Sequence, residues 1–197
     1  MVFNQLLASY ERCLARYPGL TTGAVSGLLG FAGDSFAQRV EAQRAGHKLQ
    51  LDGRRSFAFT AYAVGWGALG LRPWLVFLGQ RMPGRSFQDV AVKVAAHQFI
   101  WNPLVYLPTF YATNGLLRGQ DLTAVLEKGR KEYVGALLYI WKVWIPLSIG
   151  IFAFVPVQHQ VFFNFVGNLA WNTLLSLFYN DKAVSKQLDA SENTDQM

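Results

Sequence analysis

The sequence predicts an all-α protein, a polytopic membrane helix bundle of four spans plus a C-terminal apolar helix. Three observations carry this prediction. Hydrophobic residues make up 52% of the 197-residue chain and charged residues only 15%, whereas a soluble domain carries about 25% charged residues. Several long stretches contain no charged residue at all, and a bilayer crossing takes about 20 mostly apolar residues. Glycines recur at helical spacing inside these stretches, which is typical of helices that pack closely in lipid.

The first three spans are expected over stretches without any acidic or basic residue. The first two stretches, 17–33 and 56–71, are short, and neighbouring arginines such as Arg16 and Arg72 can lengthen them by snorkelling. The third stretch, 94–117, is long enough by itself. These stretches therefore predict three membrane-spanning helices.

The last charge-free stretch is too long for one span. It runs over 143–180, and Pro156 lies near its middle. Because proline interrupts a helix, we expect a fourth span over about 133–155 and a separate apolar helix over about 157–179. This last helix either crosses the membrane as a fifth span or lies within the bundle.

One membrane domain accounts for nearly all of the chain. Residues 1–16 form an amphipathic N-terminal segment, 17–180 the helix-bundle domain, and 181–197 a polar tail that we expect to be disordered. The single cysteine, Cys13, excludes an intramolecular disulfide. Basic residues are more numerous in the loops after the first and third spans, which predicts that these two loops face the matrix or the equivalent of the cytoplasm.

Glycines predict close packing of the first span. Gly19, Gly23 and Gly27 are spaced four apart, and Gly23, Gly27 and Gly30 share one helical stripe with Asp34, with Gln38 one turn further. Small residues let helices approach closely in lipid, so we expect this face to meet a neighbouring helix, with the glycine-rich segment 65–70 as its partner. Asp34 and Gln38 are also candidate pore-lining residues, because a carboxylate at membrane depth is a functional candidate. The packing glycines are Gly19, Gly23, Gly27 and Gly30.

A stripe of carboxamides runs along the final apolar helix. Its members recur every fourth residue, and each step turns about 40° around the helix, so they share one side. Such side chains do not face hydrocarbon, and the stripe must meet protein or water. Two alternatives stay open, namely hydrogen bonds between helices and the lining of a solute route. The candidate pore-lining residues of this stripe are Gln160, Asn164, Asn168 and Asn172.

The third span carries a second group of polar residues. His97, Gln98 and Asn102 lie on adjoining stripes of its helix and are candidate pore-lining residues. The alternative is that His97 is a buried histidine whose hydrogen bonds are satisfied. Pro103 and Pro108 must leave backbone carbonyls without their usual donors, so another group has to supply those hydrogen bonds.

Catalysis, metal binding and nucleic-acid binding find little support in the sequence. It contains no glycine-rich phosphate loop, nucleophile elbow, zinc-protease motif or carboxylate pair on one face. Its histidines are scattered, without a second ligand at helical spacing, and the net charge of +6 is not gathered in a basic domain. We therefore expect no enzyme, no metal, no cofactor and no nucleic acid. The expected partners are the lipid bilayer, small hydrophilic solutes and, in a homo-oligomer, further copies of the chain.

The order of several short motifs resembles a known family. The motifs are "GLLGFAGDSFAQ", "LDGRR", "GLRPWLVFL", "KVAAHQFIWNP", "WIPLSIGIFAFVP" and "WNTLLS", and the resemblance covers about residues 10–179. The family is that of the Mpv-seventeen protein and the 22-kDa peroxisomal membrane protein. Asp34 and Gln38 match its GD…Q element, and Asp52 and Arg55 match its D..R element. Its later landmarks are matched by Trp144, Pro156, Trp171 and Ser176.

The resemblance implies a small integral protein of the mitochondrial inner membrane or, alternatively, the peroxisomal membrane. It also implies four spans, no cofactor and the behaviour of a weakly selective channel for small solutes. The opening "YERCLARYP" is more similar to the mitochondrial branch. The chain departs from the family at polar positions, with His97 where an aspartate is common and Gln160 where an arginine is frequent.

These observations lead to two functional hypotheses of different classes. The first is an organellar channel or pore for small hydrophilic solutes, which would support mitochondrial metabolite or nucleotide homeostasis. The second is a non-conducting structural or assembly protein of the organelle membrane, whose polar stripes only hold the bundle together. A membrane enzyme is a weaker third hypothesis, because the sequence offers no identifiable nucleophile.

Overall fold

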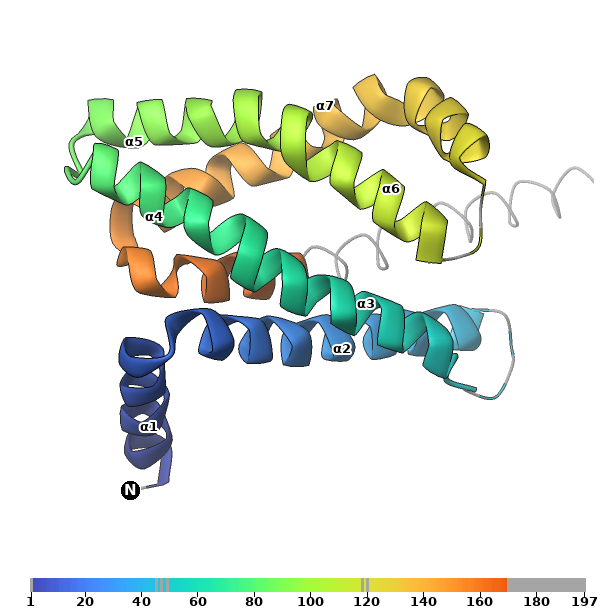
Figure 1. Ribbon diagram of the computed structural model, residues 1–197, viewed down its shortest axis with the longest axis horizontal. Coiled ribbons are helices and arrows are strands. Elements are labelled where there is room, and N and C mark those ends of the chain that lie inside the picture. Colours follow the sequence, from blue (N-terminus) through green and yellow to red (C-terminus); the bar gives the residue numbers. More distant parts are fainter. Residues whose placement is uncertain are drawn as a thin grey trace, which may run out of the picture.

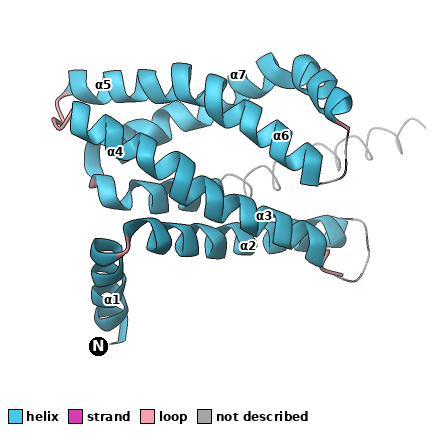
Figure 2. Ribbon diagram, viewed as in Figure 1, coloured by secondary structure: helices cyan, strands magenta, loops and turns pink. Residues whose placement is uncertain are grey.

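The computed structural model consists of helices and short connections over the residues that it describes. The described residues contain no strand, and short turns and loops join the helices (Figure 2). The all-α prediction is therefore confirmed. Asn172 and the expected tail, 181–197, lie outside the described residues, as does the expected last helix beyond residue 169. The described residues are 2–44, 46, 48, 50–117, 119 and 121–169.

The four stretches expected as spans fall almost entirely within long continuous helices, the first of them in α2. A π-helix, η1, joins α3 to α4 without a break, and a second π-helix, η2, joins α5 to α6 in the same way. Helix α7 has 33 residues and contains the expected fourth span, 133–155. The helix after η3 is described over 160–169. The bounds are α1 Val2–Arg16, α2 Pro18–Arg44, α3 Gly53–Gly65, η1 Trp66–Leu71, α4 Arg72–Arg81, α5 Phe87–Ala95, η2 Ala96–Tyr106, α6 Leu107–Leu117, α7 Leu122–Phe154 and η3 Val157–His159.

Prolines and capping residues set the ends of these helices. Pro18 opens α2, where its missing N–H loses no helical hydrogen bond. Asp52 caps α3 by accepting a hydrogen bond from a backbone N–H of the first turn, and Ser86 caps α5 through a capping box with Asp89. Pro156 favours extended backbone at the residue before it, and α7 ends there.

The helices form one bundle from which α1 projects. Helix α2 packs along α3 and η1, while α5 and α6 pack along α7. Helix α4 rises away from α2 towards α5, and α1 lies crosswise to α2 at its N-terminal end (Figure 1). The C-terminal ends of α2 and α6 lie at the same end of the bundle (Figure 1). The two loops that the basic residues predict to share one side of the membrane follow these helix ends in the sequence.

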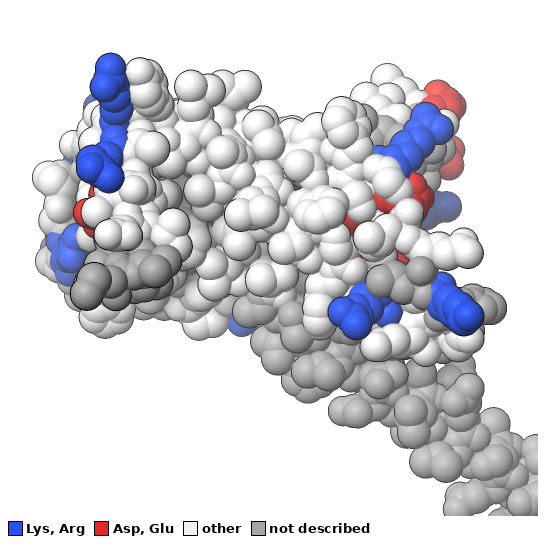
Figure 3. All heavy atoms as spheres, turned by 90° about the horizontal axis from the view of Figure 1, so that it is seen from below, with Lys and Arg blue, Asp and Glu red and all other residues white. Residues whose placement is uncertain are grey.

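The bundle is apolar outside and partly polar inside. Large apolar side chains project outward, as at Leu69, which is 82% exposed, whereas Gln98, Ser26 and Ser148 are almost completely buried. On the face shown in Figure 3, the charged side chains gather toward the two ends and the middle band carries almost none. Soluble proteins keep large apolar patches few, so this distribution suits a lipid surrounding.

A hydrophobic cluster fills the end of the bundle near the connection from α4 to α5. Its members come from α3, η1, α4, α5, α7 and the helix 160–169, and they include Leu75, Leu78, Val94 and Phe152. By length and hydropathy, one helix among the described residues qualifies on its own as a membrane span, namely Gly129–Phe154 within α7. The remaining long helices carry more of the polar residues that the bundle buries.

Candidate functional site

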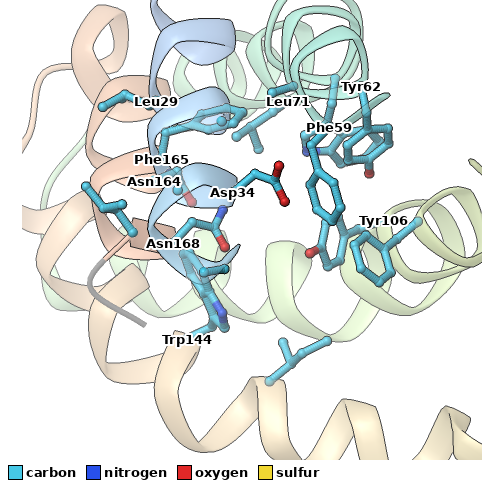
Figure 4. Close-up of a pocket in the computed structure, with 18 of the residues that line it drawn as sticks. Leu29, Asp34, Phe59, Tyr62, Leu71, Tyr106, Trp144, Asn164, Phe165 and Asn168 are labelled. Atoms are coloured by element: carbon cyan, nitrogen blue, oxygen red, sulfur yellow. The ribbon is translucent and has the colours of Figure 1, made fainter. Parts of the chain in front are cut away.

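A cavity of about 510 Å³ lies at the centre of the bundle (Figure 4). Its wall is formed by α2, α3, α6, α7, both π-helices and the helix 160–169. Leu71 and Phe165 belong both to the wall and to the hydrophobic cluster, so the cluster closes the cavity on that side. Of the candidate pore-lining residues, the wall contains Asp34, His97, Asn102, Asn164 and Asn168.

Asp34 is the buried centre of a hydrogen-bond network between α2 and α3. Its side chain is 1% exposed. Its Oδ2 accepts hydrogen bonds from Ser56 Oγ and from Gln38 Nε2, both at 2.7 Å, and its Oδ1 accepts one from Arg55 Nε at 2.9 Å. A buried carboxylate must be paired and hydrogen-bonded to be tolerated, and these three donors meet that requirement. Asp34 therefore joins helices as well as lining the cavity.

Arg55 connects this buried carboxylate to the surface. Its Nη1 and Nη2 donate to the two carboxylate oxygens of Glu41 at 2.8 and 3.0 Å, a bidentate arrangement that suits arginine. The hydrogen bond to Glu41 is the largest cause that raises the pKa of Arg55 above its ordinary value. Gln38 Oε1 accepts a hydrogen bond from the backbone N–H of Asp52 at 2.7 Å. The GD…Q and D..R elements, which are separated in sequence, thus meet in one network.

Two of the packing glycines bring α2 into close contact with α3. A Cβ on Gly30 would lie 2.6 Å from the Cβ of Ala63, and a Cβ on Gly27 would lie 2.6 Å from a methyl group of Val64. Real Cβ atoms do not approach this closely, so the two helices can pack in this way only because both positions are glycine.

The other glycines on this surface behave differently from one another. A Cβ on Gly23 would make ordinary contacts with α3 and η1. Gly67, in the expected partner segment 65–70, faces Ser26 so closely that no Cβ fits. No described atom lies within 4 Å of a Cβ built on Gly19. A side chain at position 19 would therefore meet no described neighbour, because α4 has diverged from the N-terminal end of α2 (Figure 1).

Gln98 lies between helices and not in the cavity wall. Its Nε2 donates to Ser148 Oγ at 2.7 Å and to the carbonyl oxygen of Trp144 at 3.1 Å, both on α7. Its Oε1 accepts a hydrogen bond from Asn102 Nδ2 at 2.8 Å. The sequence predicts Gln98 as a pore-lining residue, but in the structure it links η2 to α7. Its carboxamide is hydrogen-bonded to Trp144 and Ser148 of α7 and to Asn102 of η2.

The two prolines of the third span fit the π-helical hydrogen-bond register. In η2 each N–H bonds the carbonyl five residues before it, as residue 107 does to residue 102. In this register Pro103 leaves the carbonyl of Gln98 without a backbone donor, and Pro108 does the same to the carbonyl of Pro103. Trp141 Nε1 donates to the first carbonyl at 2.9 Å, and the hydroxyl of Tyr133 donates to the second. Both replacement donors come from α7.

His97 is buried in the cavity wall. Its Nδ1 accepts a hydrogen bond from Trp74 Nε1 at 2.9 Å, and its ring lies edge-on to Phe152 with 5.9 Å between the centroids. A neutral imidazole that accepts at Nδ1 carries its proton on Nε2. The Nδ1 of His97 is therefore satisfied, as expected of a buried histidine. Its Nε2–H is the group of this ring that can donate to another molecule.

The carboxamide stripe of the last helix divides into two parts. Gln160 is buried, and its Nε2 donates to the carbonyl of Val155 at 3.0 Å, which ties the helix to its own start. Asn164 Nδ2 donates to the carbonyl of Gln160 at 2.8 Å. Asn164 and Asn168 line the cavity beside Asp34 (Figure 4), whereas the contacts place Gln160 outside the wall. Asn172 lies outside the described residues.

Aromatic side chains form much of the wall opposite this stripe. Tyr62 and Trp66 of one long helix face Trp101 and Tyr106 of the next, with 5.5 Å between the ring centroids of Trp66 and Tyr106. The sequence did not mark Tyr62 and Trp66 as site residues, since an aromatic ring within an apolar span is equally typical of a core or lipid-facing position. Their spacing of one helical turn was the only signal.

The chemistry available in the cavity is hydrogen bonding and ring contact. Among the residues that the structure describes, no cluster of three or more His, Cys, Asp or Glu side chains could hold a metal ion. The charged residues of the wall, Asp34, Glu41 and Arg55, are bonded to one another. The neutral residues His97 and Asn168 lie in the same wall. The arrangement can therefore hold a small molecule through hydrogen bonds and ring contacts, and it offers no activated nucleophile among these groups.

Comparison with known proteins identifies the relatives of the chain. A match to the Mpv17 / PMP22 family covers residues 115–176. Protein SYM1 of Kluyveromyces lactis is 30% identical over 88% of this chain and 89% of its own length. Peroxisomal membrane protein 2 of Bos taurus is 28% identical over 88% and 89%, and mitochondrial inner membrane protein Mpv17 of Caenorhabditis briggsae is 26% identical over 87% and 91%. No solved structure matches.

The printed names of two of these relatives place them in organelle membranes, one peroxisomal and one in the mitochondrial inner membrane. These are the two locations expected from the sequence. The network of Asp34, Gln38, Asp52 and Arg55 gives a structural basis to the motifs that carried the resemblance. The chain belongs to the Mpv17 / PMP22 family of organellar membrane proteins.

Proposed function

We propose that this chain is a multi-pass protein of the mitochondrial inner membrane and forms a weakly selective route for small hydrophilic solutes. The observation that carries the proposal is the central cavity, whose wall combines polar side chains from several helices that are apolar outside. Polar side chains are tolerated at membrane depth where they line a cavity or pair with one another.

Four spans are part of this proposal. Helix α2 has 27 residues, which corresponds to about 40 Å of helix, and the hydrocarbon core is about 30 Å thick. The α3–η1–α4 helix, the α5–η2–α6 helix and α7 are of similar or greater length. The charge-poor middle band supports an orientation in which the long axis of the bundle crosses the bilayer (Figure 3).

The route is closed in this conformation. The hydrophobic cluster around Leu75, Leu78 and Phe152 lies between the cavity and one end of the bundle. A solute could cross only when these side chains separate, which makes the cluster a hydrophobic gate of the kind that excludes water from a constriction. The opposite part of the cavity is bordered by Arg55 and Glu41.

A second candidate function is a non-conducting structural protein with no catalytic role. It is favoured by Gln38, Gln98 and Gln160, whose carboxamides bond neighbouring backbone or side-chain groups. Each such bond is worth about 1 kcal/mol in a membrane. These residues would stabilise the bundle whether or not it conducts.

Purified protein in planar bilayers tests the first proposal. Discrete current steps would support the route, while silence over many protein-rich membranes would favour the structural role. A cysteine scan adds a second measurement, in a Cys13→Ala background because Cys13 is exposed. Asn164→Cys and Asn168→Cys should react with small hydrophilic thiol reagents, since the reactive thiolate needs water. The controls Phe162→Cys and Val166→Cys, on the outer side of the same helix, should remain unmodified.

A further inference from the structure

We infer that the cavity is a binding site for a planar, uncharged solute with a carboxamide-like edge. The inference rests on the proposed function, because it names the class of solute that the route admits.

The cavity wall offers hydrogen-bond donors, of which His97 contributes one. Trp74 Nε1 donates to His97 Nδ1 at 2.9 Å, so the proton of the neutral ring is on Nε2. Two further donors of the wall, Tyr62 Oη and Trp101 Nε1, are buried without a hydrogen-bond partner among the described residues. The Nε2–H of His97, the indole N–H of Trp101 and the hydroxyl of Tyr62 can therefore donate to a carbonyl oxygen of a bound molecule.

The carboxamides of the wall asparagines offer hydrogen-bond acceptors to the cavity. Asn102 Nδ2 donates to Gln98 Oε1, and Asn164 Nδ2 donates to the carbonyl oxygen of Gln160, both at 2.8 Å. These bonds fix the orientation of the two carboxamides, and each Oδ1 is left as an acceptor. Asn168 adds a third carboxamide to the same wall. A ligand that fits these groups carries an acceptor together with N–H donors, which is the pattern of an amide.

The charged side chains of the cavity wall are already bonded to one another, two carboxylates to one guanidinium. The charged residues of the wall are Asp34, Glu41 and Arg55, and the guanidinium of Arg55 bonds both carboxylates. An anionic solute would therefore meet no free cation, and a cationic solute would have to compete with Arg55 for Asp34. Burying a charge without a partner is strongly unfavourable, so the cavity favours a neutral solute over either ion.

Aromatic rings shape the space between the polar groups of the cavity. Trp101, Trp144 and Phe165 line the cavity together with His97 and the asparagines. Flat aromatic surfaces favour a flat ligand through stacked and edge-on contacts. The volume of about 510 Å³ exceeds that of a single six-membered ring with a carboxamide substituent, so such a probe fits.

Three isosteric probes test the inference on the purified full-length protein in detergent. Benzamide is neutral, benzoate is an anion and benzamidinium is a cation, and all three share one ring and nearly one shape. Isothermal titration at pH 7 should show saturable binding of benzamide and at least tenfold weaker binding of both ions. Equal or tighter binding of either ion, or benzamide uptake that does not saturate, would overturn the inference.

Variants locate the site. Asn168→Leu should weaken benzamide binding at least tenfold and leave the fold intact, because no described hydrogen bond holds this side chain. His97→Phe should have a similar effect if the protein remains folded. Gln80→Leu, an exposed carboxamide on α4 outside the cavity, is the matched control and should bind benzamide as the unmodified protein does. An Asn168→Leu protein with unchanged affinity would also overturn the inference.

Planar bilayer currents separate this inference from the proposed function. Saturable benzamide binding without any current would leave the binding site standing and refute the solute route. Current without benzamide binding would leave the route standing and refute the assigned solute class.

Discussion

The indole Nε1 of Trp141 lies 2.9 Å from the carbonyl oxygen of Gln98, the acceptor that Pro103 leaves without a backbone donor in the π-helical register of η2. The hydroxyl of Tyr133 fills the same role for the carbonyl of Pro103, which Pro108 leaves open. Two prolines five residues apart are thus matched by two aromatic donors on α7. The third span can therefore contain two prolines in its middle without burying unsatisfied carbonyls there.

Trp141→Phe tests this pairing. The variant keeps a ring but loses the donor, so the unfolding free energy in detergent should fall by about 1 kcal/mol, the usual worth of such a bond in a membrane protein. Adding Pro103→Ala should recover most of the loss, because alanine restores a backbone N–H that can bond Gln98. A double variant as unstable as Trp141→Phe alone would contradict the assignment.

Arg55→Ala tests the network around Asp34. Removing the guanidinium leaves a carboxylate that is 1% exposed without its ion pair, and Arg55 itself is 26% exposed, so the expected loss is about 1–3 kcal/mol, the cost of leaving a buried polar group without a partner. Arg54→Ala is the matched control, because Arg54 is exposed and adjacent in sequence. Chemical unfolding of the two variants in the same detergent should show a large loss for Arg55→Ala and a negligible one for Arg54→Ala. Equal effects would mean that the network does not stabilise the bundle.

Gly30→Ala and Gly19→Ala separate close packing from helix propensity. The new methyl group at position 30 meets the Cβ of Ala63, which cannot rotate away, so the helices must shift apart at a cost of about 1–3 kcal/mol. At position 19 nothing described obstructs a Cβ, and alanine should be neutral or stabilising by up to about 1 kcal/mol. The melting temperature in detergent should therefore fall for Gly30→Ala and stay the same or rise for Gly19→Ala.

The capping box of α5 predicts a pH dependence outside the membrane. The hydrogen bond from the Ser86 side chain is the largest cause that lowers the pKa of Asp89 below its ordinary value of 3.8. A carboxyl whose folded pKa is lowered stabilises the helix end above the unfolded pKa, and the stabilisation is lost as the pH falls through the folded pKa. Amide hydrogen exchange in the first turn of α5 should accelerate, relative to its intrinsic rate, below about pH 4.

Asp89→Asn is the control for this prediction. Asparagine keeps the size of the side chain but does not titrate in this range, so the relative exchange rate of the same amides should be nearly independent of pH between 5 and about 3. The same pH dependence in both proteins would show that another group is responsible.

The sequence by itself determined that the chain forms apolar helices and that these helices suit a lipid surrounding. The scarcity of charge and the spacing of glycines predict apolar helices that pack closely, and the structure has long helices at the expected stretches with Gly27 and Gly30 against α3. The motifs around Asp34, Gln38, Asp52 and Arg55 identify the family before any coordinate is known. These features are readable because each depends on residue type and local spacing alone.

Only the tertiary structure decided which polar residue faces a cavity and which faces another helix. Gln98 and Asn102 lie four residues apart on the same helix, yet Gln98 is hydrogen-bonded to α7 while Asn102 lines the cavity. The π-helical turns rotate these side chains away from the positions of a regular α-helix, and a residue sequence does not reveal where such turns occur. Gly19 lacks its expected contact for a related reason, since the path of α4 depends on how all the helices pack. The partners of a side chain are set by the arrangement of distant segments, which local spacing does not encode.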